Sequence, residues 1–137
     1  MTAVIDTSVT LAWIYEDERS VPVEKVFKII SEVGGWVPAI WHLEVTNGLQ
    51  QGIRRGRIDA AYRDGVFADL AALPITVDPD TNMLAWDQTI ALSDRFRLTA
   101  YDASYLELAQ RRGLPLATLD HDLRDAGRAL GLELLGA

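Results

Sequence analysis

Short apolar runs alternate with longer stretches of helical periodicity along the chain. Four runs rich in β-branched or aliphatic residues predict buried strands, at 3–5, 36–37, 75–77 and 115–119. A fifth run, at 132–135, predicts an edge strand. Because strands alternate with helices or helix pairs, the pattern predicts an α/β fold with a mostly parallel central sheet of four to five strands.

Helix signals fill the intervals between these runs. Capping residues precede apolar positions at helical spacing, and glycine or proline follows them. The predicted helices cover 9–14, 20–33, 40–55, 59–73, 80–96, 99–112 and 123–130. No repeat, linker or low-complexity segment interrupts them, so we expect a single domain over 1–137.

Composition removes several kinds of site. The 137 residues include no cysteine, which excludes disulfides and thiolate-bound metals, so any metal must be held by oxygen or by His42 and His121. No run approaches the roughly 18 apolar residues of a membrane span, and the N-terminus lacks the pattern of a secretory signal. We therefore expect a cytoplasmic protein without a membrane partner.

The formal net charge of −7 argues at first against a nucleic-acid partner, because phosphate binding requires local positive charge. The distribution of the basic residues qualifies this, since Lys25 and Lys28 are the only lysines and all others are arginines. The arginine clusters are 54, 55 and 57; 95 and 97; 111 and 112; and 124 and 128. Each cluster either solvates a helix end or contacts phosphate, and the segment 54–57 is a candidate for the RNA backbone.

Four acidic residues are distinguished by their positions. Asp6 and Asp120 follow predicted strands, Asp102 lies at a predicted helix start, and Glu44 lies on the helix after a short strand. Right-handed winding of a parallel sheet brings these points to one edge. Like charges that converge raise one another's pKa unless a cation intervenes, and carboxylates suit Mg²⁺ or Mn²⁺. The pattern predicts a metal site of the kind that cleaves phosphodiesters.

Each acid also has a simpler interpretation. Asp6 fits a helix N-cap, although we expect Thr7 or Ser8 to take that role. Asp102 fits a capping box with Thr99. Glu44 fits an ordinary polar helix stripe, because Asn47 and Gln51 follow it at i+3 and i+7. Asp120 competes with Asp122 as fourth acid, and Thr118 is either a support for a metal ligand or a partner of the backbone.

Four segments together resemble the signatures of PIN-domain ribonucleases, and most closely those of VapC-type toxins from bacterial toxin–antitoxin pairs. They are Val-Ile-Asp-Thr-Ser at 4–8, Glu-Val-Thr-Asn at 44–47, the run 99–109, and the run 116–123. The resemblance implies a three-layer α/β/α fold. It also implies an Mg²⁺ or Mn²⁺ site formed by four acids, Asp6, Glu44, Asp102 and Asp120. The supporting polar residues would be Ser8, Asn47 and Thr118. Asp122 would act beside Asp120 or in its place.

We accordingly expect a metal-dependent endoribonuclease that acts as a toxin. In this hypothesis Asp6, Glu44 and Asp102 hold the cation, while Asp120 positions a second ion or the attacking water. The resemblance further implies a homodimer and a small antitoxin that lies in a groove around the first helices. Four apolar residues are either antitoxin contacts or core: Trp13, Ile14, Tyr15 and Phe27.

Two other functions remain open. One is an inactive PIN-like module that only binds RNA or protein. The other is an aspartate-nucleophile phosphohydrolase that uses Asp6, a class that usually has a second acid two residues later, where this chain has Ser8.

Overall fold

The computed structural model covers residues 1–137, and its five strands form one parallel sheet. The strand order is β3-β2-β1-β4-β5. The strands are β1 (Ala3–Ile5), β2 (Gly35–Val37), β3 (Ile75–Val77), β4 (Leu116–Ala117) and β5 (Leu134–Leu135). The predicted α/β class and mostly parallel sheet are confirmed.

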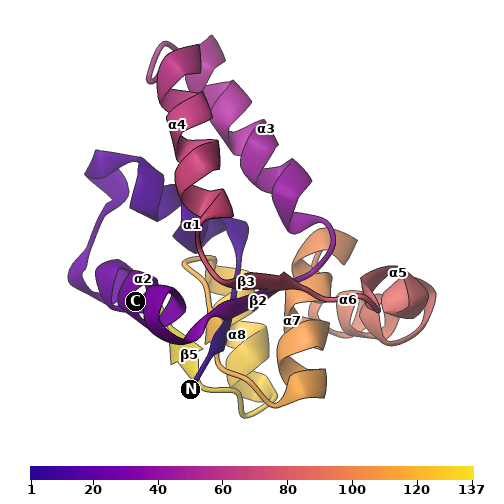
Figure 1. The fold of residues 1–137 in the computed structure, drawn as a ribbon. Helices are drawn as coiled ribbons and strands as arrows, with labels where there is room; N and C mark the ends of the chain where they lie inside the picture. Colours follow the sequence, from indigo (N-terminus) through magenta and orange to yellow (C-terminus); the bar gives the residue numbers. More distant parts are fainter.

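Eight α-helices and two short helical turns connect the strands (Figure 1). The first half contains α1 (Thr7–Ile14), the turn η1 (Glu16–Glu18), α2 (Val21–Val33), α3 (Trp41–Arg54) and α4 (Ala60–Ala71). The second half contains α5 (Thr81–Leu84), the π-helical turn η2 (Ala85–Thr89), α6 (Ile90–Phe96), α7 (Ala100–Arg112) and α8 (His121–Ala129).

The direction of the chain across the sheet reverses once. From β1 it proceeds through β2 to β3, and it then returns to the other side of β1 to form β4 and β5. Right-handed crossovers in opposite directions place their helices on opposite faces, which gives the predicted three layers. Strands β1 and β4 meet where the direction reverses, and the carboxyl ends of such a strand pair border the crevice in which α/β proteins bind ligands.

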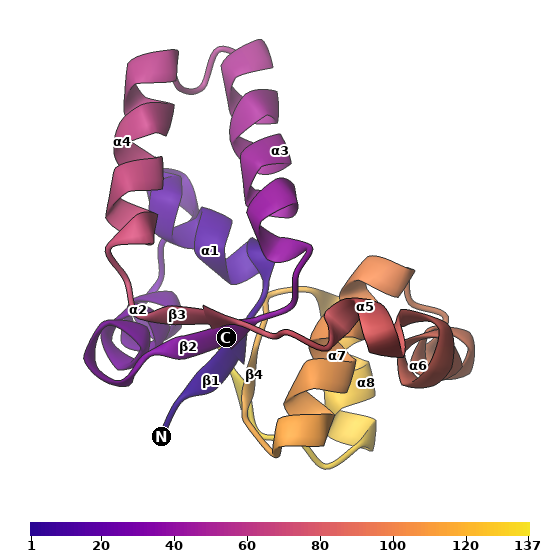
Figure 2. The same ribbon diagram turned by 45° about the vertical axis from the view of Figure 1, so that its right-hand side comes forward.

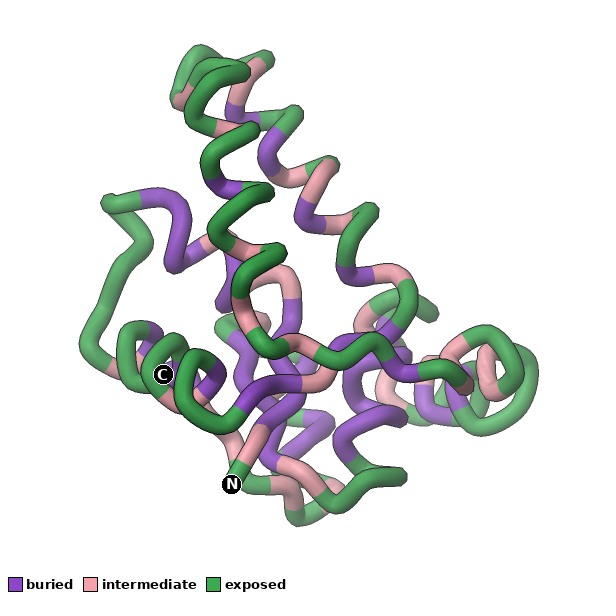
Figure 3. The backbone as a smooth tube through the Cα atoms, viewed as in Figure 1, coloured by how far each residue is buried: buried purple, intermediate pink, exposed green.

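Helices α3 and α4 form a hairpin that projects from one face of the sheet, and we call residues 41–71 the α3–α4 arm (Figure 2). The arm packs on the molecule through one side of α3, where Trp41, Val45 and Leu49 are buried. Its tip is largely exposed, as the tube coloured by burial shows (Figure 3). The arm therefore presents much of its surface to solvent.

The core centres on β1 and α7. All three residues of β1 are fully buried, and α7 is buried without interruption from Ala103 to Ala109. Among the apolar residues near the N-terminus, Trp13, Ile14 and Tyr15 belong to this core, whereas Phe27 is 42% exposed. Most of that set is therefore core.

Several predicted bounds differ from the structure. The expected strands 115–119 and 132–135 shrink to two residues each. At the outer ends the backbone leaves the sheet, because the Leu119 N–H donates to the Ser8 hydroxyl and the Leu132 N–H donates to the Gly127 carbonyl of α8. The expected helix 80–96 contains the π-helical turn and ends at Arg97, whose φ of 54° is left-handed. Gly34 also has a positive φ, and a Cβ there would lie 2.8 Å from the Pro74 carbonyl oxygen.

None of the helices has the length and apolarity that crossing a membrane requires.

Candidate active site

Asp6 lies directly after β1, 4% exposed, and accepts three hydrogen bonds. Its Oδ1 accepts from the Ser8 hydroxyl at 2.6 Å and from the Val9 backbone N–H at 3.0 Å, and its Oδ2 accepts from the Thr118 hydroxyl. Burial raises the pKa of Asp6, against the effect of these bonds, and the charge of Asp120 raises it further.

Asp6 itself is the N-cap of α1, so the expectation that Thr7 or Ser8 would cap this helix is wrong. The reason is geometric: Asp6 keeps extended backbone angles, and its carboxylate reaches the Val9 N–H. The two hydroxyl residues are thereby free for other contacts. Ser8 bonds to Asp6, and Thr7 bonds to Glu44.

The end of β4 is joined to the end of β1 by two hydroxyl groups. The Thr118 hydroxyl donates to Asp6 and accepts from the backbone N–H of Asp120 at 3.0 Å. The Ser8 hydroxyl donates to Asp6 and accepts from the backbone N–H of Leu119 at 2.9 Å. These bonds fix the chain that leads into Asp120, whose own Oδ2 caps α8 by accepting from the Leu123 N–H at 2.9 Å.

Glu44 lies in the first turn of α3, and two hydroxyl groups hold one of its oxygens. The Tyr105 hydroxyl donates to Glu44 Oε1 at 2.6 Å, and the Thr7 hydroxyl donates to the same atom at 3.1 Å. Burial and the charge of Glu44 raise the pKa of Tyr105, which keeps the phenol protonated as a donor. Both bonds end on Oε1, so the other oxygen of this carboxylate remains available.

Asp102 lies in the first turn of α7, half-buried. Its backbone N–H donates to the Thr99 hydroxyl at 3.1 Å, whereas the return bond of a capping box, from Thr99 N–H to the Asp102 carboxylate, does not form. Burial, the largest cause, and the charges of Asp120, Asp6 and Glu44 together raise the pKa of Asp102 to about 6. The fold therefore brings Asp6, Glu44 and Asp120 within electrostatic reach of Asp102.

No positive side chain compensates this charge. None of the four acids takes part in an ion pair. As the side chains stand, no group of three Asp, Glu or His residues is arranged to hold a metal ion. The chemistry of the set nevertheless fits Mg²⁺ or Mn²⁺, because unpaired carboxylate oxygens are the ligands these hard cations prefer.

The supporting residues proposed from the sequence differ in whether they contact the four acids. Ser8 and Thr118 contact Asp6 directly. Asn47 is exposed on α3 without a hydrogen bond to any of the acids, although it lies one turn after Glu44. Asp122 is exposed and is not among the charges that act on Asp6 or Asp102, whereas Asp120 acts on both.

Tyr105 was not among the site residues predicted from the sequence. Its spacing could have indicated it, because Tyr105 follows Asp102 by three residues and therefore shares its face of α7. Its apolar neighbours made a core position the simpler interpretation. The structure shows both properties, since the ring is buried and the hydroxyl reaches Glu44.

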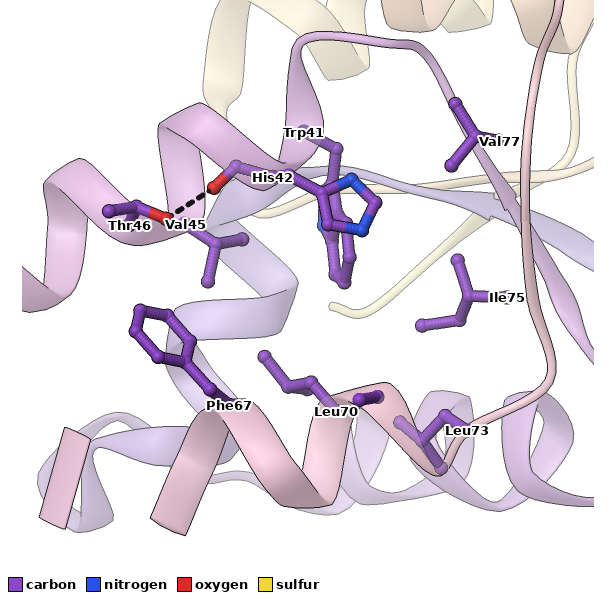
Figure 4. A pocket seen from close by; sticks show the side chains of 10 residues that line it. Trp41, His42, Val45, Thr46, Phe67, Leu70, Leu73, Ile75 and Val77 are labelled. Atoms are coloured by element: carbon purple, nitrogen blue, oxygen red, sulfur yellow. Dashed lines mark hydrogen bonds between the residues drawn. The ribbon is translucent and has the colours of Figure 1, made fainter. Parts of the chain in front are cut away.

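An apolar groove of about 400 Å³ lies between α3, α4 and β3, and none of the four acids lines it (Figure 4). Trp41 and Val45 of α3 face Phe67 and Leu70 of α4 across it, and Val77 borders one end. A smaller groove beside α1 and α2 is bordered by Trp13 and Phe27. Both grooves offer apolar side chains to a partner.

Comparison with known proteins yields consistent matches. Residues 3–129 match the model of the family described as PIN domain. Ribonuclease VapC3 of Mycobacterium tuberculosis is 36% identical over 91 residues, which are 65% of this chain and 62% of that protein. The match thus spans less than two thirds of this relative. Ribonuclease VapC9 of the same organism is 29% identical over 126 residues, 92% of this chain and 91% of that protein.

A solved structure also resembles this one over most of its length. The crystal structure of PAE2754 from Pyrobaculum aerophilum superposes with a TM-score of 0.68 at 26% sequence identity. The match covers 92% of this chain and 87% of that chain. The similarity therefore includes both halves of the sheet and the helices around them.

Proposed function

Because this chain belongs to the PIN-domain family, we propose that it is a metal-dependent endoribonuclease of the VapC type that hydrolyses RNA phosphodiester bonds. The proposal is carried by one observation: the charges of Asp120, Asp6 and Glu44 act together on Asp102, and no cation of the protein balances them. The names of the relatives, both ribonucleases, support the choice of RNA as substrate.

We assign Asp6, Glu44, Asp102 and Asp120 as the groups that would hold Mg²⁺ or Mn²⁺. When bound, such an ion lowers the pKa of a water molecule and neutralises charge that develops on the phosphate. Ser8 and Thr118 orient Asp6, and Tyr105 and Thr7 orient Glu44 through Oε1, so both carboxylates are held before substrate arrives.

The geometry disfavours the phosphohydrolase alternative. A nucleophilic aspartate of that class usually has a second acid two residues later, yet that position is Ser8, which donates to Asp6 Oδ1 at 2.6 Å. Asp6 is also only 4% exposed, which disfavours attack by its carboxylate on a phosphorus atom. Trapping a covalent aspartyl-phosphate at Asp6 would reverse this assignment.

The deciding experiment is cleavage of total RNA with Mg²⁺ or Mn²⁺ by the native chain and by Asp6→Asn. Asparagine preserves the N-cap of α1 and removes one charge. We expect cleavage by the native chain, its loss in EDTA, and its loss in the variant. Binding of RNA without any cleavage would instead favour the inactive-module alternative.

We further propose that the chain is a toxin neutralised by a small antitoxin in the cytoplasm, where its RNA substrate lies. The two apolar grooves support this partner, since exposed Phe67 and Val77 border one and exposed Phe27 borders the other. Replacing Phe67 or Phe27 by aspartate and testing co-purification with the antitoxin separates the two grooves.

A homodimer is the remaining part of the proposal. Met83, Trp86 and Ile90 are exposed within 81–96, and Trp86 is 95% exposed. An apolar face of this kind suits a second copy of the chain. Trp86→Ser is expected to shift the solution mass from dimer to monomer, and an unchanged dimer would place the interface elsewhere.

A further inference from the structure

Four arginines lie at the tip of the α3–α4 arm, and two of them stabilise the arm itself. Arg57 pairs with Asp17 at 2.9 Å, and its guanidinium lies 4.0 Å from the centre of the Tyr15 ring. Arg63 pairs with Asp64 and also donates to Gln50 Oε1 at 2.9 Å, which joins α4 to α3. The positive charges of Arg57 and Arg63 are therefore committed within the protein.

Arg54 and Arg55 are different. Arg54 is the last residue of α3 and Arg55 is its C-cap, both are exposed, and neither side chain makes an ion pair or a hydrogen bond. Cations at a helix C-terminus complement the helix dipole, which accounts for one function of the pair. Two adjacent unpaired guanidinium groups on a chain of net charge −7 also form a local site for phosphate.

A polar track connects this tip to the acids. Glu44, Asn47 and Gln51 lie at i, i+3 and i+7 of α3, and Arg54 and Arg55 follow Gln51 by three and four residues, so one face carries them all. Asn47 and Gln51 are exposed, and their side-chain amides make no hydrogen bond within the protein. At 1.5 Å per residue, the track extends about 15 Å from Glu44 to the tip.

We propose that this face of α3 binds the single-stranded RNA that extends beyond the cleaved phosphate, with Arg54 and Arg55 contacting its backbone about 15 Å away. At about 3.4 Å per stacked nucleotide, the distance corresponds to four or five nucleotides. Asn47 and Gln51 face the intervening segment and offer amide groups to it. The proposal rests on the proposed ribonuclease function, because it assigns the substrate's path from that site.

The first test measures binding without cleavage, in full-length Asp6→Asn protein with a labelled 16-nucleotide single-stranded RNA. The slope of log K against log salt falls by about 0.7 for each phosphate that the protein no longer neutralises. Replacing both Arg54 and Arg55 by glutamine is expected to reduce the slope by about 1.4. The matched control replaces Lys25 and Lys28 of α2, which are also exposed and unpaired, and is expected to leave the slope unchanged.

The second test measures cleavage of 3- and 16-nucleotide RNAs by the native chain and by the Arg54→Gln/Arg55→Gln variant. We expect a raised KM and an unchanged kcat on the long RNA, and no change on the short one. Equal effects on both lengths, no effect on either, or a control that matches the arginine variant would overturn the proposal. A purely structural role would lower Tm without changing the salt slope, and would overturn it too.

The two proposals fail separately. If the native chain cuts no RNA, the proposed function fails, and the salt slope alone decides whether the arm binds RNA. If the native chain cuts RNA and the arginine variant retains its slope and its KM, the path along α3 is wrong while the nuclease remains.

Discussion

The hydroxyl group of Thr118 donates a hydrogen bond to Asp6 Oδ2 although 112 residues separate the two in sequence. The same hydroxyl accepts from the backbone N–H of Asp120. One oxygen atom therefore sets the position of two of the four acids, at the junction of β1 and β4.

Thr118→Val is expected to reduce RNA cleavage or metal affinity by about 10- to 100-fold, because it removes a group that orients a proposed ligand. It also leaves Asp6 Oδ2 and the Asp120 N–H unpaired, at a cost of about 1–3 kcal/mol in the free energy of unfolding. Cleavage assays and urea unfolding measure the two effects. Thr46→Val is the control, since the Thr46 hydroxyl donates only to the His42 carbonyl of the same helix, α3. Cleavage by Thr118→Val at the rate of the native chain would contradict the assignment.

Tyr105→Phe removes the shorter of the two hydrogen bonds to Glu44 Oε1 and preserves the buried ring. We expect cleavage to fall by about 10-fold or more while the free energy of unfolding changes by only about 1 kcal/mol. The matched control is Tyr62→Phe, because the Tyr62 hydroxyl donates to the Ile14 carbonyl, away from the acids. An equal loss in both variants would mean that Tyr105 acts only through stability.

The stability of the metal-free protein is expected to decrease as pH rises from about 4 to about 6. The pKa of Asp102 is raised from 3.8 to about 6, so the folded state binds this proton more tightly than the unfolded state does. Ionisation therefore costs stability, about 1–2 kcal/mol after allowance for solvent screening of a half-buried group. Thermal unfolding measured against pH should show this loss of stability in the native chain and not in Asp102→Asn. The same pH dependence in both proteins would contradict the electrostatic account.

Saturating Mn²⁺ should stabilise the fold. A ligand at 100 times its Kd adds about 2.7 kcal/mol, which for a chain of this size raises Tm by roughly 8 °C. The shift should shrink at acid pH, where protonation of Asp102 competes with the cation, and should be small in Asp6→Asn. Equal shifts in both proteins would show that the ion binds away from these acids.

A separate ionic network stabilises the end of α7. Arg111 pairs with buried Asp78 at 2.6 Å and with buried Glu107 at 2.8 Å. Although burial raises the pKa of Asp78, the hydrogen bonds and charge of Arg111 lower it overall, so this contribution is lost only in strong acid. Arg111→Met should lower the free energy of unfolding by about 3–5 kcal/mol. Arg128→Met should lower it by less than about 1 kcal/mol, because its partner Asp125 is exposed. Urea unfolding distinguishes the two.

The sequence predicted the parallel sheet because its strands and helices follow from hydrophobic periodicity, whereas the three layers were implied by the resemblance to PIN domains. Runs of β-branched residues marked the strands, and the handedness of the crossovers then required Asp6 and Asp120 to share an edge. Glu44 and Asp102 lie on helices, and whether their carboxylates face that edge depends on helix tilt and side-chain direction, which the periodicity of the sequence does not specify.

The partners of individual polar atoms could not be predicted. Arg57 belonged to the candidate RNA-contacting cluster, yet it pairs with Asp17, 40 residues away, because the connection between α3 and α4 lies beside η1. Tyr105 was indistinguishable from a core residue until its hydroxyl had a position. These choices depend on distances of a few ångströms between segments far apart in sequence, which residue spacing does not encode.

Asp6 and Asp120 each begin a helix while contributing charge to the acidic cluster. Under the proposed function, selection on catalysis and selection on folding therefore act on the same two side chains. A descendant that abandoned RNA cleavage would be free to lose Glu44 and Asp102, but helix initiation would still favour asparagine, serine or threonine at 6 and 120. Decay of activity in this lineage should thus leave a recognisable trace, with neutral capping residues persisting where the acids once were.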